Sequence, residues 1–127
     1  MTKVLNGDEY EEMAAAFQCA QIQLLDEALQ EQGLPMSMRR TICEVFTHKF
    51  SVFLDQCWFE SEVGKVFPVV GFARRHQDYE PEAIHLNNGA FAFAEYAFGD
   101  IGWYFDEHKA EPGSQRIGSV SESGEPA

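Results

Sequence analysis

Two long stretches with apolar residues at helical spacing, separated by a four-residue break, place the strongest constraint on the fold. In both the stretch from Asp8 to Gln32 and the one that starts at Ser37 and ends at Glu60 or Glu62, apolar residues recur every three or four positions, which is the period of an amphipathic helix. Between them, Gly33-Leu34-Pro35 supplies a left-handed stop and a residue that cannot continue a helix. A linker this short predicts two helices folded back as an antiparallel hairpin.

The second of these helices carries more aromatic surface than the first can cover. Phe46, Phe50, Phe53 and Trp58 all fall within it. We therefore expect a further element, flat enough to cover several large side chains, to lie against the helical hairpin.

The chain after the helices contains strand and turn signals. Residues 65–75 (KVFPVVGFARR) are rich in Val and Phe and are interrupted by proline and glycine, a pattern that predicts a bent edge strand. Residues 76–82 have the composition of a loop, and the short apolar run 83–86 leads into Asn88-Gly89. Asn-Gly is the strongest two-residue signal for a β-hairpin.

The most aromatic part of the chain is residues 87–105, NNGAFAFAEYAFGDIGWYF, with seven aromatic side chains in nineteen residues. If Gly99-Asp100 forms a second tight turn, residues 90–98 are a strand paired on both sides. The alternative is a single helix. Gly89, Gly99 and Gly102 would each weaken such a helix by about 1 kcal/mol relative to alanine, so strands are favoured and the helix stays open.

These patterns together predict an α+β fold, an N-terminal antiparallel helical hairpin packed on a C-terminal antiparallel β-meander of three to four strands. Residues 1–110 form the single α+β domain in this interpretation. Residues 111–127, rich in Gly, Ser, Pro and Glu, are expected to form a flexible acidic tail.

The predicted meander has an outer face that no remaining element of the chain covers. It carries five large side chains, namely Ile84, Leu86, Phe91, Phe93 and Tyr104. An exposed apolar patch of this size usually marks an interface or a ligand groove. The sequence therefore predicts a homodimer that associates through this face, or a groove for an apolar small molecule.

The charge of the chain limits its partners. With 21 acidic and 9 basic residues the net charge is −12, which disfavours nucleic acids and anionic membranes because both need clustered Lys and Arg. A basic protein that meets the carboxylates of the first helix, as for an antitoxin-like or immunity-like protein, remains an alternative. The N-terminus has neither a signal nor a transit pattern, so we expect a cytoplasmic protein with its three cysteines reduced.

No familiar catalytic or metal-binding motif occurs in the sequence, and the four histidines are not at metal-ligand spacing; no cofactor or metal is expected. An enzyme remains an alternative, because the predicted sheet register gathers Glu95, Tyr104, Asp106 and His108 on one face. Carboxylates beside a histidine on an apolar floor can act as general acid and base. A polar rim that keeps the sheet face soluble is the favoured interpretation of the same residues.

Two segments, DQCWFESEVGKVFPVVGFA at residues 55–73 and FAEYAFGDIGWYF at residues 93–105, carry a resemblance to known proteins. The chain resembles small uncharacterised proteins encoded on the mobile integron gene cassettes of bacteria. The resemblance implies a bacterial cytosolic origin and an oligomeric state. It implies no catalytic residue.

Overall fold

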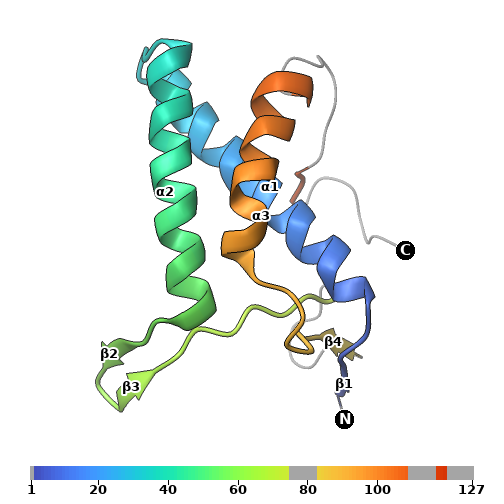
Figure 1. The fold of residues 1–127 in the computed structure, drawn as a ribbon. Helices are drawn as coiled ribbons and strands as arrows, with labels where there is room; N and C mark the ends of the chain where they lie inside the picture. Colours follow the sequence, from blue (N-terminus) through green and yellow to red (C-terminus); the bar gives the residue numbers. More distant parts are fainter. Residues whose placement is uncertain (1, 75–82, 109–116, 120–127) are drawn as a thin grey trace.

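The computed structural model describes residues 2–74, 83–108 and 117–119 of the 127-residue chain, and it mixes helices with short strands (Figure 1). In chain order the elements are β1 (Lys3–Leu5), α1 (Glu9–Glu31), α2 (Met36–Gln56), β2 (Phe59–Ser61), β3 (Gly64–Val66), β4 (Ala83–His85), α3 (Phe93–Gly102) and the π-helix η1 (Trp103–His108). In this part of the chain no helix is long and apolar enough to cross a membrane.

The predicted helical hairpin is confirmed by α1 and α2. At the end of α1 the backbone N–H of Gly33 donates to the carbonyl of Gln30 at 2.9 Å, and that of Leu34 donates to Leu29 at 3.3 Å. These two bonds are a Schellman motif, with Gly33 in the left-handed region at φ 81°. Pro35 then precedes the first residue of α2, so the stop, the turn and the restart occur where the sequence predicted them.

The predicted β-meander is wrong, because residues 93–108 are helical. α3 lies beside α2 and across α1 (Figure 1), and it packs on both of them. The turn expected at Gly99-Asp100 lies inside α3, and the strands expected on either side of it do not form. The flat element that the helical hairpin needed is therefore a third helix, not a sheet.

α3 forms because its apolar residues share one face and because its first turn is capped from a distance. Phe93, Ala97 and Ile101 are buried, four residues apart, and the buried Phe105 continues the same spacing into η1. The backbone N–H groups of Phe93 and Ala94 donate to the two carboxylate oxygens of Asp55, each at 2.8 Å. This tertiary cap occupies donors that begin every helix without a partner.

Asn88-Gly89 does turn the chain, but not as a hairpin. Gly89 has φ 96°, and the side chain of Asn87 accepts hydrogen bonds from the N–H groups of Gly89 and Phe91 at 2.9 and 3.3 Å. Asparagine side chains that bond the backbone two residues on form Asx turns. The turn leads from β4 into α3.

The sheets are small and lie at the ends of the helices. β2 and β3 form an antiparallel hairpin in which Phe59 is opposite Val66, and this hairpin extends from the end of α2 away from the other helices (Figure 1). β1 pairs in parallel with β4, and Phe72 bridges to His85. Of the edge strand predicted over 65–75, residues 65–66 belong to β3; the predicted loop 76–82 and most of the predicted tail lie outside the described residues.

The interior has two apolar clusters joined by polar residues. One cluster is centred on Ile22, Cys43, Ile101, Tyr104 and Phe105, and the other on Tyr10, Ala14, Phe91 and Phe93. Between them the buried Gln18 of α1 donates through Nε2 to Ser51 Oγ at 2.8 Å and to the carbonyl of Phe93 at 3.2 Å. Hydrogen bonds of this kind fix how the three helices meet, because a buried polar group without a partner is costly.

Candidate functional site

The most distinctive exposed feature is a row of stacked aromatic rings along α2. The ring centroids of Phe46 and Phe50 are 5.5 Å apart, those of Phe50 and Phe53 are 6.1 Å apart, and those of Phe53 and Phe59 are 5.9 Å apart. The row thus begins on the middle of α2 and ends on β2. We name the row and its exposed neighbours the aromatic ridge, which consists of Val45, Phe46, Phe50, Phe53, Trp58 and Phe59.

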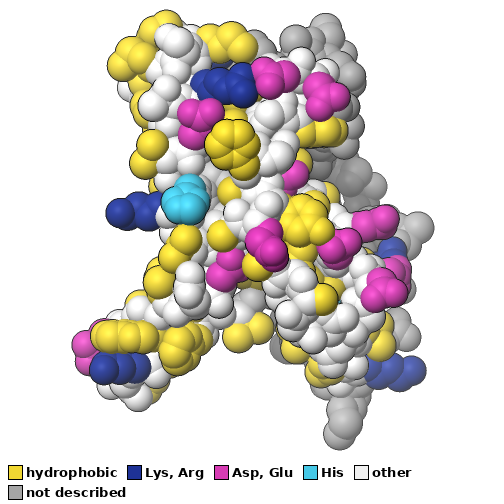
Figure 2. All heavy atoms as spheres, in the orientation of Figure 1, with side chains coloured by type: hydrophobic (Ala, Val, Ile, Leu, Met, Phe, Trp, Pro, Cys, Tyr) yellow, Lys and Arg dark blue, Asp and Glu magenta, His cyan; other side chains and the backbone are white. Residues whose placement is uncertain are grey.

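The aromatic ridge faces solvent although α1 and α3 both pack on α2. Val45 is 63% exposed, Phe46 42%, Trp58 47% and Phe59 43%. Hydrophobic side chains gather along the edge of the molecule formed by α2 and over the β2–β3 hairpin (Figure 2). The neighbouring face of α2, which contacts the rest of the chain, buries Cys43, Thr47 and Ser51, and the ridge residues Phe50 and Phe53 beside it are half-buried.

The β2–β3 hairpin extends the aromatic ridge sideways. Lys65 lies over the ring of Trp58 with its Nζ 4.3 Å from the ring centroid, a cation–π contact. Val63 at the tip of the hairpin is 90% exposed, and Phe67 after β3 is exposed as well. An arm with this many apolar side chains in water is typical of a surface that another molecule covers.

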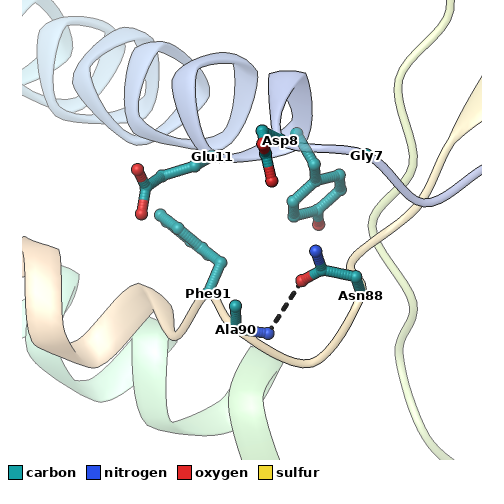
Figure 3. A pocket seen from close by; sticks show the side chains of 7 residues that line it. Gly7, Asp8, Glu11, Asn88, Ala90 and Phe91 are labelled. Atoms are coloured by element: carbon teal, nitrogen blue, oxygen red, sulfur yellow. Dashed lines mark hydrogen bonds between the residues drawn. The ribbon is translucent and has the colours of Figure 1, made fainter.

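A small pocket lies between the start of α1 and the loop before α3 (Figure 3). It has a volume of about 110 Å³ and is lined by Gly7, Asp8, Tyr10, Glu11, Asn88, Ala90 and Phe91. Several of its polar groups are engaged, since Asn88 Oδ1 accepts from the N–H of Ala90 at 2.9 Å and Glu11 accepts from the hydroxyl of Tyr96 at 2.5 Å. Its volume is below the roughly 150 Å³ of an engineered cavity that binds benzene.

The five residues predicted to form an interface do not share one face. Phe91 and Phe93 are buried against Tyr10 and Ala14, whereas Tyr104 is buried in the other cluster. Ile84 and Leu86 are half-buried and lie against Gly71, where an added Cβ would come within 2.9 Å of each side chain. The chain itself covers these residues, so the sheet face that motivated the predicted dimer is not present.

Three residues of the predicted acid–base cluster, Glu95, Tyr104 and Asp106, are also separated. Tyr104 donates to the buried Asp26 at 2.9 Å, whereas Asp106 is exposed and paired with Arg40 at 2.6 Å, a contact that lowers the pKa of Asp106. Glu95 lies in the first turn of α3, eleven residues before Asp106 and thus roughly 16 Å away along a helix. His108 is the last residue of η1.

The most buried charged group belongs to an interhelical network. Asp26 of α1 accepts from Arg39 Nε at 2.7 Å and from the Tyr104 hydroxyl, while Arg39 also donates to the carbonyl of Leu34 at 2.8 Å. Burial, and then the hydrogen bond to Asp26, raises the pKa of Tyr104. Burial raises the pKa of the neighbouring Cys43 thiol to about 11. A protonated thiol and phenol around a paired carboxylate suit a structural role, because neither is poised to react near neutral pH.

Asp100 of α3 is a second carboxylate that is shielded from solvent, and it is partly buried. Burial raises the pKa of Asp100 to about 6, although a hydrogen bond from Cys19 acts to lower this pKa. Its Oδ2 has no hydrogen-bond partner among the described residues. Within the same described part of the chain no three His, Cys, Asp or Glu side chains gather to hold a metal ion.

Comparison of the chain with protein-family models, with curated proteins and with solved structures finds no match. The function is therefore argued from the residues of this chain alone.

The sequence contained the signal for the aromatic ridge, although the sequence analysis did not use it for the site. Phe46, Phe50 and Phe53 are spaced four and three residues apart, which places them on one helix face. They were expected to be covered by a sheet. The spacing could not reveal which face of α2 the third element would cover.

Proposed function

We propose that this protein is a non-catalytic interaction module that associates with copies of itself through the aromatic ridge. The observation that carries the proposal is the row of neighbouring rings from Phe46 to Phe59, of which Phe46 and Phe59 are exposed and Phe50 and Phe53 are half-buried. Large rings held in one row are pre-ordered for contact, so covering them costs little side-chain entropy. Rings of this kind dominate the energetics of protein interfaces.

The exposed apolar area approaches what one partner buries in a standard interface, which supports the proposed dimer. A fully exposed aromatic side chain offers about 150–250 Å², so each ridge residue at its observed exposure offers on the order of 100 Å². Together with the exposed side chains around it, the surface reaches on the order of 700 Å² per chain; a standard interface buries about 800 Å² per partner. The surrounding side chains are Met38, Val63 and Phe67.

The distribution of charge supports a second copy as the partner. Residues 36–67, which include the β2–β3 hairpin, hold four basic residues (Arg39, Arg40, Lys49, Lys65) and four acidic ones (Glu44, Asp55, Glu60, Glu62), a net charge of zero within a chain of −12. The remaining residues therefore carry the whole −12. Two copies repel each other least where α2 faces α2, whereas a basic protein would be drawn to the acidic remainder.

The test is the mass in solution of the wild type and of a ridge variant. Val45→Glu with Phe46→Glu places two carboxylates on the aromatic ridge at exposed positions, so folding should be retained. Light scattering at micromolar concentration should give twice the 14.4 kDa chain mass for the wild type and the chain mass for the variant. Phe98→Glu is the matched control, because Phe98 is 86% exposed but lies on α3; it should remain dimeric. A wild type that stays monomeric contradicts the proposal.

A further inference from the structure

The exposed face of α2 has a seven-residue repeat. Met38, Ile42, Val45, Lys49, Val52 and Gln56 follow one another at steps of four, three, four, three and four residues. This is the a/d spacing of a coiled-coil seam. Each of the six is exposed or half-buried, whereas Cys43, Thr47 and Ser51, at intervening positions, are buried against the chain's own helices. The repeat therefore lies on the side of α2 that faces outward.

The seam and the aromatic ridge lie side by side on α2. Val45 belongs to both, and Phe46 and Phe53 each come directly after a seam residue, so both rings flank the same side of the seam. With these rings beside it, the apolar surface is broader than the a/d stripe of a strict coiled coil. It suits one long partner helix that lies along α2 and contacts the rings with its own apolar face.

The geometry points to a second copy of α2 as this partner helix, running antiparallel, with Lys49 as the residue that selects the orientation. This inference rests on the proposed function and adds to it the arrangement of the two copies. In a parallel pair in register each Lys49 would lie beside Lys49 of the other copy, and like charges at the centre of an apolar seam are unfavourable. In an antiparallel pair centred near residue 47, Lys49 lies opposite Val45, and its ammonium can reach the solvent along its aliphatic stem.

The same register accounts for the β2–β3 hairpin. Antiparallel pairing about residue 47 places the start of one α2, where Met36 and Met38 are exposed, beside Trp58 and Phe59 at the base of the other copy's hairpin. The hairpin leaves the end of α2 sideways (Figure 1), so it lies where the partner helix begins. A parallel pair would instead bring the two hairpins together and place the start of one α2 beside the start of the other.

Cross-linking between two single-cysteine additions distinguishes the orientations. Ile42→Cys and Val52→Cys are made in separate chains, one of which carries a tag that changes its mass. Antiparallel pairing places residue 42 opposite residue 52, so a mixture should oxidise to the disulfide between the two different chains. Each variant alone should give little disulfide-linked dimer. Identical positions are then about 15 Å apart along the helices, which exceeds the roughly 7 Å between Cα atoms that a disulfide spans. The mixed product should exceed the like-with-like products at least tenfold.

The oxidised wild type is the control for the native cysteines, and light scattering confirms that each variant still dimerises. A dimer that gives only like-with-like disulfides would be parallel, and a dimer that gives neither would use another register or face. Both results overturn the inference. The proposed function then stands if Val45→Glu with Phe46→Glu still gives a monomer, and it fails if that variant remains dimeric. A monomeric wild type overturns both. As a second measurement, Lys49→Ile should lower the dissociation constant at least tenfold and allow like-with-like disulfides to form, which a merely exposed lysine would not do.

Discussion

Asp100→Asn tests whether the partly buried carboxylate of Asp100 destabilises the folded protein. Burial raises the pKa of Asp100 from an ordinary 3.8 to about 6, so the folded state binds the proton more tightly than the unfolded state. Below pH 3.8 the acid is protonated in both the folded and the unfolded state, so it costs the fold no stability. As the pH rises through about 6, the group ionises in the folded state and the free energy of unfolding falls. Two pKa units correspond to about 3 kcal/mol; because Asp100 is not fully buried, we expect about 1 to 2 kcal/mol.

The measurement is the free energy of unfolding in urea for wild type and Asp100→Asn, at one protein concentration, from pH 4 to pH 8. The variant should be more stable by about 1 to 2 kcal/mol at pH 8, and the difference should shrink toward zero near pH 4. Asp106→Asn serves as a control of opposite sign, because the hydrogen bond from Arg40 lowers the pKa of Asp106, so that its contribution is present at neutral pH and lost in acid. A difference for Asp100→Asn that is equal at pH 4 and pH 8 would refute the burial argument.

Two further substitutions test how α3 and η1 are held. Asp55→Ala removes both hydrogen bonds to the first turn of α3 and should lower the free energy of unfolding by about 1 to 2 kcal/mol; a loss below about 0.3 kcal/mol would show that the cap contributes nothing. Tyr104→Phe leaves the buried Asp26 with Arg39 alone and should cost about 2 kcal/mol. An unchanged urea midpoint for Tyr104→Phe would mean that another donor replaces the hydroxyl.

The first half of the fold was predictable because its signals are local. The pattern of apolar residues in α1 and α2, and the glycine between them, act within a few residues of where they stand. Gly33 adopts the left-handed conformation that was assigned to it. The sequence also indicated a turn at Asn88-Gly89, which the structure confirms, but the kind of turn depends on whether a strand or a helix comes next.

α3 was predicted wrongly for two separate reasons. The spacing of Phe93, Ala97, Ile101 and Phe105 is helical, yet the alternation of Phe91 and Phe93 with alanine is equally a strand pattern, and the glycine penalty decided between them. The compensating cap comes from Asp55, 38 residues before Phe93. A carboxylate that reaches a helix start from another element leaves no trace in the local sequence, so tertiary context overrode a correctly estimated propensity.

The candidate site was displaced by the same error. With residues 90–105 as strands, Phe91, Phe93 and Tyr104 would form an uncovered face. With those residues in or beside a helix that packs on both α1 and α2, the same side chains are part of the core. With α3 in place of the sheet, the chain still exposes apolar side chains. They lie on the part of α2 that a single helix cannot cover.

The two faces of α2 are arranged in the reverse of the pattern that a helix in a monomer needs. Its buried side consists of small or polar residues, Cys43, Thr47 and Ser51, which let α1 and α3 approach closely but supply little apolar burial. Its outward side carries Val45 and the rings of the aromatic ridge. Hydrophobic stabilisation grows with the apolar area removed from water, so covering these exposed side chains would add to the burial that α2 gains within its own chain. The proposed association would therefore be the step in which α2 buries its remaining apolar surface.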